Sequence, residues 1–330
     1  MAPRPAVAPS AAAVRARLSS AARERRMITA AIKMAVERGL VAAGTGALGR
    51  RWHRRRVLVL GYHNIVPDKA PPQGDPSLHL PFTHFQTQLD LLCRTLEIVR
   101  LGDAMIPANG NGHPRAVVTF DDAYRGAIIL GVAELARRGI PATVFVAPGF
   151  VGKKAFWWDR FAPSGARGWP PEQRRQFLSQ LGGNDSAIEA WARAHRLPEV
   201  ALDEWRRVAT EAELSEAVRS PGIELGCHSW SHSNLTALGP AELAEEIALP
   251  MAWLRQRFQP VVPWIAYPYG LHSEQVEDAA RAAGLAGGLR GSGGWWPAPA
   301  ASRFRLPRWN VPAGLSTEGF TLRAAGILCR

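Results

Sequence analysis

Short apolar runs alternate with longer amphipathic stretches along most of the chain. The runs are rich in β-branched residues and have the length of buried strands: Val57–Tyr62, Ala116–Phe120, Ala142–Ala147, Ile223–Gly226, Trp264–Tyr267 and Phe304–Val311. Between them, the spacing of apolar positions predicts helices over Thr83–Leu96, Tyr124–Arg138, Pro240–Phe258 and Ser273–Ala283. Strands that alternate with helices in this way indicate a parallel sheet with crossover helices, which is either a barrel or a doubly wound fold.

Residues 151–222 interrupt this alternation. The stretch opens with Phe156, Trp157, Trp158 and Asp159 and continues as polar, tryptophan-containing sequence of helical type. We expect it to be a helical insertion at the end of a strand. In a barrel the loops at the strand ends build the active-site face, so the insertion would shape a substrate cleft.

Composition changes the picture mainly at the N-terminus. The 330 residues are 47% hydrophobic, enough for a substantial core, and the three cysteines are too few for a disulfide scaffold. The formal net charge of +12 arises almost wholly from residues 1–56, which hold 13 of the 40 basic and 2 of the 28 acidic residues. Residues 57–330 are close to neutral, which argues against a nucleic-acid-binding globule. We therefore divide the chain into a basic N-terminal arm, 1–56, and a folded body, 57–330.

The arm supports two interpretations. Its stretch from Met27 to Leu48 is interrupted by charged residues, so it predicts neither a transmembrane helix nor the core of a signal peptide. An amphipathic helix followed by the arginine cluster at 50–56 can lie on an anionic membrane, whereas a solvated, partly disordered leader explains the same composition. We expect a cytoplasmic protein, with peripheral contact to the inner membrane under the first interpretation, and a start at either Met1 or Met27.

Candidate chemistry lies where two of the predicted strands end. Asp121 and Asp122 follow the second predicted strand, and His228 and His232 follow the fourth. Two adjacent carboxylates at a buried strand end need a cation or a proton donor nearby. Two histidines four residues apart can converge on one metal ion with a carboxylate as third ligand, which is an open catalytic zinc site. The histidine pair alone is a weak signal, and the strand-terminal carboxylates strengthen it.

Three motifs, in order, resemble the polysaccharide deacetylases of the NodB-homology family, carbohydrate esterase family 4. They are Thr-Phe-Asp-Asp at 119–122, His-Ser-x-x-His at 228–232 and Tyr-Pro-Tyr-Gly at 267–270. Gly-Tyr-His-Asn-Ile at 61–65 and Leu-Pro-Arg at 306–308 resemble bacterial members from surface-polysaccharide clusters, so the resemblance covers most of residues 57–312. It implies a distorted (β/α) barrel and metal-dependent removal of N-acetyl groups, less often O-acetyl groups, from sugars.

The resemblance also implies roles for the site residues. Asp122, His228 and His232 would hold a divalent metal ion, usually zinc, although such ligand sets also accept cobalt, nickel or manganese. Asp121 would be the general base that takes a proton from metal-activated water. The backbone N–H of Tyr269 would help to stabilise the oxyanion.

The sequence departs from the family pattern at three positions. Ala123 stands where glycine is usual, which costs little if its φ is negative. Ala266 stands where the family has an arginine that pairs with the base, and Arg308 is our candidate substitute. The Leu-x-His that supplies the general acid is absent. We assign that role to His63, which follows the first predicted strand and resembles the N-terminal histidine of some related deacetylases.

Tryptophans are candidates for contact with a sugar ring. Trp157 and Trp158 can stack on substrate and Trp295 can line the cleft, with simple packing as the alternative in each case. We predict a zinc-dependent deacetylase of N-acetylglucosamine-type residues in a polysaccharide, an oligosaccharide or a lipid-linked precursor. The alternatives are a metal-dependent amide hydrolase for a small non-sugar substrate and a non-catalytic polysaccharide-binding protein. We expect no nucleic-acid partner.

Overall fold

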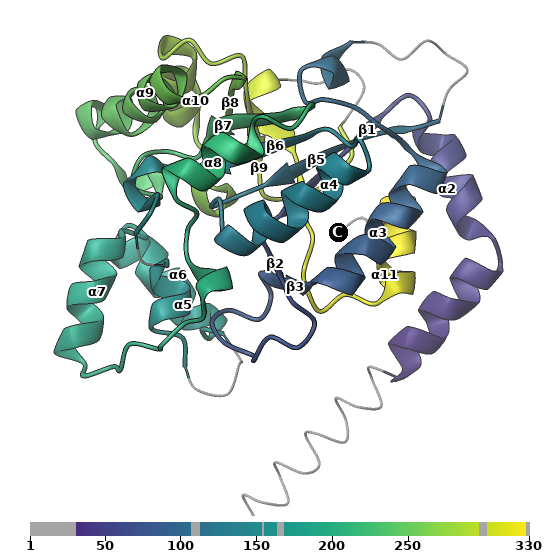
Figure 1. The fold of residues 1–330 in the computed structure, drawn as a ribbon, viewed down its shortest axis with the longest axis horizontal. Helices are drawn as coiled ribbons and strands as arrows, with labels where there is room; N and C mark the ends of the chain where they lie inside the picture. The colour runs from purple at the N-terminus through teal and green to yellow at the C-terminus, as the bar shows by residue number, and fades with distance from the viewer. Residues whose placement is uncertain (1–30, 107–112, 154, 164–167, 297–301, 328–330) are drawn as a thin grey trace, which may run out of the picture.

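The computed structural model describes residues 31–106, 113–153, 155–163, 168–296 and 302–327, and a parallel sheet forms its centre (Figure 1). The strands of this sheet and of a small separate pair are β1 Val57–Tyr62, β2 Asn64–Val66, β3 His79–Pro81, β4 Glu97–Ile98, β5 Arg115–Phe120, β6 Ala142–Val146, β7 Ile223–Cys227, β8 Val261–Ala266, β9 Gly287–Arg290, β10 Leu306–Pro307 and β11 Trp309–Asn310. Every pairing between these strands is parallel. Loops that follow the strands of the main sheet therefore gather at one end.

The main sheet curls into a nearly closed barrel. Its strands follow the order β10-β9-β8-β7-β6-β5-β1-β11, with β4 beside β5. β10 and β11 are consecutive in the chain but lie at opposite edges, since β10 pairs with β9 and β11 pairs with β1. The segment that holds them spans the seam between the two edges. The (β/α) barrel implied by the resemblance is thus confirmed.

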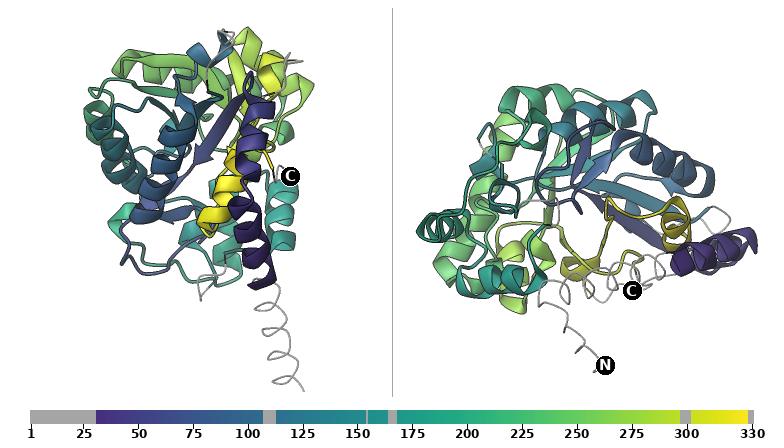
Figure 2. Two further views of the ribbon diagram at one scale, coloured as in Figure 1. Left: turned by 90° about the vertical axis from the view of Figure 1, so that its right-hand side faces the viewer. Right: turned by 90° about the horizontal axis from the view of Figure 1, so that it is seen from below.

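Helices cover the outside of the barrel (Figures 1 and 2). They are α2 Thr45–His53, α3 Phe82–Thr95, α4 Ala133–Arg137, α5 Trp157–Arg160, α6 Pro171–Gln180, α7 Asp185–Ala194, α8 Glu211–Ala217, α9 Pro240–Arg257, α10 Glu274–Ala282 and α11 Thr317–Ala324. A π-helical segment, Ala127–Val132, leads into α4. Helices α5 to α8 belong to the expected insertion, and Figure 1 shows α5, α6 and α7 grouped beside the barrel at the lower left.

The apolar sequence of β1 fits a sheet that is buried on both faces. Its sequence is an unbroken apolar run rather than an alternating one, which is typical of a strand that is covered on both sides. Val57 and Val59 join an inner cluster with Phe145, whereas Leu58 and Leu60 join the larger cluster under the helices. Polar groups that can form a site are left at the strand ends.

The single strand predicted over Phe304–Val311 is divided in the structure. A short helical turn occupies Arg303–Arg305, and β10 and β11 follow on either side of Arg308. The chain leaves the β9 edge for the β1 edge at this point, so one continuous ladder cannot form. Arg308 consequently lies at the seam of the barrel.

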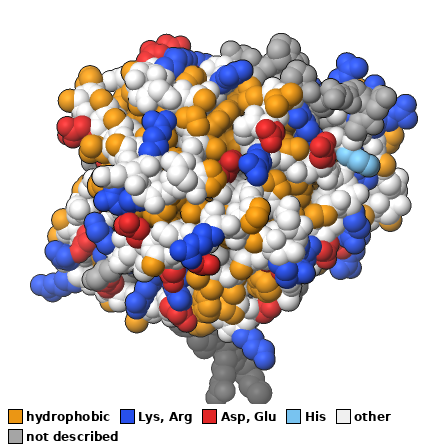
Figure 3. Space-filling view, turned by 45° about the horizontal axis from the view of Figure 1, so that its top comes forward, with side chains coloured by type: hydrophobic (Ala, Val, Ile, Leu, Met, Phe, Trp, Pro, Cys, Tyr) orange, Lys and Arg blue, Asp and Glu red, His pale blue; other side chains and the backbone are white. Residues whose placement is uncertain are grey.

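Residues 31–42 and α2 form two helices on one flank of the body, beside α11 (Figure 2). The rest of the expected arm, residues 1–30 with Met27, lies outside the described residues. Among the helices that are described, none is long and apolar enough to cross a bilayer. On the face in Figure 3, basic and acidic side chains are interspersed, which fits the near-neutral charge of residues 57–330.

Candidate metal centre and active site

Asp121 and Asp122 lie where β5 ends, at the carboxyl end of the barrel. The Asp121 N–H donates to the Tyr62 carbonyl at 2.9 Å, so the hydrogen bonding with β1 continues past the strand. Asp122 and Ala123 then adopt left-handed conformations, with φ of 67° and 50°. This corrects the expectation for Ala123, since a residue with a Cβ in this region costs roughly 1–2 kcal/mol that glycine avoids.

Asp122, His228 and His232 converge at one buried point. The Nε2 atoms of His228 and His232 lie 3.4 and 3.2 Å from Oδ1 of Asp122, and the candidate ligand atoms of all three residues lie within 4.8 Å of one another. Each side chain is buried. In the part of the chain that the structure describes, no other group of three His, Cys, Asp or Glu side chains is close enough to hold a metal ion.

The chemistry of this group fits a divalent cation. Oδ1 of Asp122 is buried and has no hydrogen-bond partner among the described residues. Burial raises the pKa of this carboxyl, but the charge of His232 and contacts with His228 outweigh it and hold the pKa well below its usual value. A buried, ionised oxygen without a donor needs a cation, and two imidazoles with one carboxylate match an open zinc site.

Backbone contacts orient both histidines. Nδ1 of His228 donates to the Ala266 carbonyl at 2.7 Å, which leaves Nε2 free to bind a metal ion. The His232 N–H donates to Ser229 Oγ at 3.0 Å, and Ser229 and His232 have φ of 59° and 55°. With Tyr269 and the turn after β5, five of the six non-glycine residues described with positive φ surround this site. Such concentrated backbone strain is typical of a functional site.

Arg308 forms a two-pronged ion pair with Asp121. Its Nη1 and Nη2 donate to Oδ1 and Oδ2 at 2.6 and 2.5 Å, and Nη1 also reaches Thr119 Oγ1 at 3.3 Å. Burial by itself raises the pKa of Asp121, but the charges of Arg308 and His228 outweigh it and hold the pKa below its usual value. Asp121 is therefore ionised at neutral pH. Position 266 is an alanine, and Arg308, from the segment that crosses the seam, is the arginine that contacts Asp121.

His63 lies on the other side of Asp121, directly after β1. Its Nε2 is 3.9 Å from Oδ2 of Asp121, and its side chain is 15% exposed and lines an open pocket. Burial lowers the pKa of His63 by more than the charges of Asp122 and Asp121 raise it. The protonated imidazole is thus a stronger acid than a free histidine. The structure brings His63 and Arg308 to the same carboxylate, as the sequence suggested.

The pocket lies over these groups and is walled by side chains from α5, α6, β11 and the loops around them. Besides the carboxylates, histidines and Arg308 already described, its lining includes Ser77, Trp158, Arg174, Tyr269 and Asn310. Trp158 and Tyr269 supply aromatic surface, and the other three supply polar groups. Of the three tryptophans predicted to contact substrate, only Trp158 lines the pocket, and Tyr269, predicted to act through its backbone N–H, lines it as well.

Trp157 and Trp295 do not line it, which corrects the expectation for both. Trp157 is 1% exposed, and its Nε1 donates to the Tyr269 hydroxyl at 3.1 Å, so its ring packs behind the wall. The Trp295 ring packs at a tilt against the His53 ring, with ring centroids 4.5 Å apart, and Trp295 pairs with Leu58 near the start of β1. The chain returns to the amino ends of the strands between β9 and β10, so Trp295 lies at the opposite end of the barrel.

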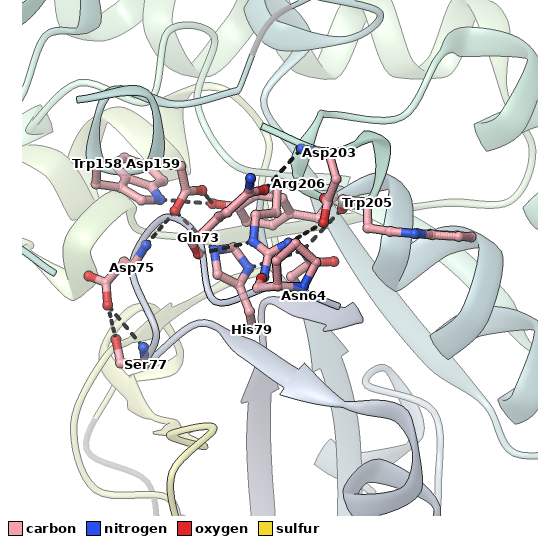
Figure 4. Close-up of polar contacts among 12 residues, drawn as sticks. Asn64, Gln73, Asp75, Ser77, His79, Trp158, Asp159, Asp203, Trp205 and Arg206 are labelled. Carbon is pink, nitrogen blue, oxygen red and sulfur yellow. Dashed lines mark hydrogen bonds and ion pairs between the residues drawn. The ribbon is translucent and has the colours of Figure 1, made fainter. Parts of the chain in front are cut away.

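A buried hydrogen-bond network supports the wall formed by Trp158 (Figure 4). Asp159 is fully buried, and its Oδ2 accepts from the Tyr124 hydroxyl at 2.5 Å. Its Oδ1 accepts from the Asp75 N–H at 2.7 Å and from His79 Nε2 at 3.0 Å. The Tyr124 hydroxyl in turn accepts from Trp158 Nε1 at 2.8 Å. One carboxylate therefore holds the Trp158 indole and the loop around Asp75.

This loop forms a further wall of the pocket. The Ser77 N–H and hydroxyl donate to Asp75 Oδ1 at 3.0 and 2.7 Å, and Arg174 donates to Oδ2 at 2.7 Å. The Trp158 ring also lies 5.0 Å from the ring of His232. The network thus connects the pocket walls with the metal centre.

Reasoning from the sequence did not find the network or the polar residues of the pocket wall. Asp159 was visible in the Phe-Trp-Trp-Asp stretch, but His79 precedes it by 80 residues and Tyr124 by 35. These residues share no spacing rule that could have linked them. Asn310 lines the pocket from β11. No sequence pattern indicated this, because the division of the predicted strand at the seam is visible only in the structure.

Replacing Tyr124 with phenylalanine tests the network. The change removes the hydroxyl between Asp159 and Trp158, so we expect the KM for acetylated substrate to rise about fivefold, with kcat nearly unchanged, from the loss of its two buried hydrogen bonds. Tyr62→Phe is the matched control, because it removes a buried hydroxyl bonded to Gln88 instead. Equal KM values in the two variants would show that the network does not position Trp158.

Comparisons with known proteins agree with this geometry. The sequence model of the family described as polysaccharide deacetylase matches residues 108–288, more than half of the chain. The deacetylase PplD from Streptococcus pyogenes, in complex with acetate, is 16% identical, with a TM-score of 0.54 over 80% of this chain and 96% of that one. IcaB from Ammonifex degensii is 18% identical, with a TM-score of 0.54 over 83% and 97%.

A polysaccharide deacetylase from Bacillus cereus is 15% identical, with a TM-score of 0.56 over 82% of this chain and 69% of that one. No curated protein matches the sequence at a significant level. At these identities the solved structures establish the shared barrel, while the match over residues 108–288 establishes the family. This chain belongs to the polysaccharide deacetylases, the hydrolases of carbohydrate esterase family 4.

Proposed function

We propose that the enzyme removes N-acetyl groups from N-acetylglucosamine-type residues of a polysaccharide, an oligosaccharide or a lipid-linked precursor. One observation carries the proposal: the unpartnered Oδ1 of Asp122, as judged over the described residues, faces two imidazole Nε2 atoms beside a second, ionised carboxylate, Asp121. A metal site next to a general base suits the hydrolysis of an unreactive amide.

Asp122, His228 and His232 would hold the divalent ion, zinc in the first place, with cobalt, nickel or manganese as substitutes. Such an ion supplies a Lewis acid for the acetyl carbonyl and a bound water of lowered pKa. The Ala266 carbonyl keeps the His228 tautomer that this binding requires.

Asp121 acts as the general base in this proposal. Its lowered pKa keeps the carboxylate ionised, and the two bonds from Arg308 fix its plane so that it can accept a proton from the attacking water. Arg308 touches the base rather than the substrate, so it is a positioning residue.

His63 is the general acid. The amine must be protonated as it leaves, because an amide anion is a very poor leaving group. His63 lies in the pocket lining within 3.9 Å of the base, and burial makes its protonated form a stronger acid. The Tyr269 N–H is the proposed donor to the oxyanion.

The pocket lining supports a sugar as the substrate. Trp158 and Tyr269 offer aromatic surface, and Ser77, Arg174 and Asn310 offer polar groups for hydroxyls. Oδ1 of Asn310 is buried without a partner among the residues described, so it can accept from a ligand. PplD, solved with acetate, carries in its complex the product that this reaction would release.

Metal removal tests the proposal. We expect chelated protein to release no acetate from N-acetylglucosamine oligomers, and one equivalent of zinc to restore release. A parallel set of small N-acetylated amines should remain intact. Release from the small amides but not from the sugars would favour the non-sugar amide hydrolase. If the protein neither bound zinc nor released acetate, the result would favour a non-catalytic polysaccharide-binding protein.

A further inference from the structure

Helix α2 carries two large apolar side chains on its outer side. Leu48 is 70% exposed and Trp52 is 80% exposed, and they lie four residues apart, so they are neighbours on one side of the helix. Gly46, Gly49 and His53 are buried and form the side that faces the body. An indole left in water to this extent is unusual for a residue that ordinarily packs or binds.

The exposure of Trp52 follows from how firmly α2 is seated. A Cβ at Gly49 would lie 2.2 Å from the Ala325 carbonyl oxygen, and a Cβ at Gly326 would lie 2.4 Å from the His53 ring. The His53 ring also packs against the Trp295 ring, with centroids 4.5 Å apart. These close contacts fix the rotation of α2 about its axis, so Leu48 and Trp52 cannot turn inward.

Arginines without partners accompany this apolar pair. Arg50, Arg51, Arg54, Arg55 and Arg56 form no ion pair or hydrogen bond through their side chains with any other described residue. Three of them, Arg51, Arg54 and Arg55, are exposed. Among the exposed arginines described in the body, by comparison, seven of thirteen form an ion pair with a carboxylate.

The preceding helix adds apolar surface to the same flank. In residues 31–42, Ile32 is 59% exposed, Met34 is 44% exposed and Val36 is 56% exposed. Figure 2 shows both helices on the outside of the molecule, beside α11 rather than between other elements. Their outer surface is therefore open to a partner.

We propose that the outer side of α2, with Leu48, Arg51 and Trp52, together with the exposed Arg54 and Arg55 directly after it, binds the surface of an anionic phospholipid membrane. Tryptophan and leucine insert at the level of the headgroups, and arginines attract the phosphates around them. The charge of the segment favours a lipid surface over a second copy of this chain, because two such faces would bring like charges together. The body itself is near neutral, so attraction would be confined to this flank.

Co-sedimentation of the full chain with lipid vesicles tests the proposal. We expect binding to phosphatidylcholine vesicles that contain phosphatidylglycerol, and little binding to phosphatidylcholine alone. The double variant Leu48→Ser, Trp52→Ser should bind anionic vesicles at least about fivefold more weakly, because it withdraws apolar area from the membrane interface. The total tryptophan emission, to which Trp52 contributes as one of 12 tryptophans, should shift to the blue with anionic vesicles in the wild type but not in the double variant.

The control is Leu249→Ser, which removes an exposed leucine, 49% exposed, from α9 on the body. It should bind vesicles like the wild type, and both variants should release acetate normally in solution. Equal vesicle binding by the double variant and the wild type would overturn the proposal. A wild-type dimer in light scattering that the double variant converts to a monomer would also overturn it, since the face would then join two copies.

Discussion

Replacing Asp121 with asparagine is expected to lower kcat for acetate release by about a thousandfold, the middle of the range for loss of a general base. Asparagine keeps the shape of the side chain and can still accept a hydrogen bond from Arg308, but it cannot take a proton. Because Asp122, His228 and His232 supply the proposed ligands, bound zinc should remain at one ion per chain. Steady-state kinetics and metal analysis of the same preparation measure both quantities.

Asp278→Asn is the control for this variant, since Asp278 is an exposed partner of Arg281 on α10. It should retain normal turnover. If Asp121→Asn kept most of the wild-type kcat with zinc bound, the base would have to be another residue.

Replacing Arg308 with methionine is expected to destabilise the protein by about 3–5 kcal/mol, the range for removing one partner of a buried ion pair. Arg308 is 1% exposed, and without it Asp121 would be a buried carboxylate that has lost its nearest cation. Chemical denaturation measures the loss. Arg308→Lys should recover part of it, because lysine keeps the charge but not the two-pronged contact.

Arg308→Met should also shift the pH dependence of activity to higher pH. Burial raises the pKa of Asp121 and Arg308 lowers it, with the net pKa below its usual value. The stability that this carboxylate contributes is present above its unfolded pKa, about 3.9, and is lost as the pH falls through the folded pKa. Without Arg308 the folded pKa rises, so the acid limb of the pH–activity profile should move to higher pH.

Arg303→Met provides the control, since Arg303 is exposed in the same segment. Its stability and pH profile should match the wild type. An unmoved acid limb in Arg308→Met, measured on folded and zinc-loaded protein, would mean that Arg308 does not set the ionisation of the base.

The strands β1 and β5 show what could be predicted from sequence. β1 is an unbroken apolar run and β5 is apolar apart from Arg115 and Thr119. Polar residues follow both strands, and the prediction for Val57–Tyr62 coincides with β1. Parallel strands bring their carboxyl ends together, so His63 after β1 and Asp121 after β5 had to lie near one another once the two strands paired. Local pattern and strand direction were sufficient for this part of the site.

Other features depend on contacts that no local pattern encodes. The left-handed conformation of Ala123 arises from the turn that directs Asp122 into the site, where a negative φ had been assumed. The prediction that Trp295 lines the cleft was wrong because the chain returns to the opposite end of the barrel, and the glycine-rich sequence does not reveal this return. The bonds of Asp159 to His79 and Tyr124 join distant segments through side chains alone.

Titration of metal-stripped protein with zinc, while acetate release from N-acetylglucosamine oligomers is followed, tests the central claim most directly. We expect release to rise in proportion to bound zinc, to level off at one ion per chain, and to be absent at every zinc concentration in Asp122→Ala. Undiminished release by fully stripped wild-type protein would contradict the account, because the three buried ligands would then have no part in the reaction.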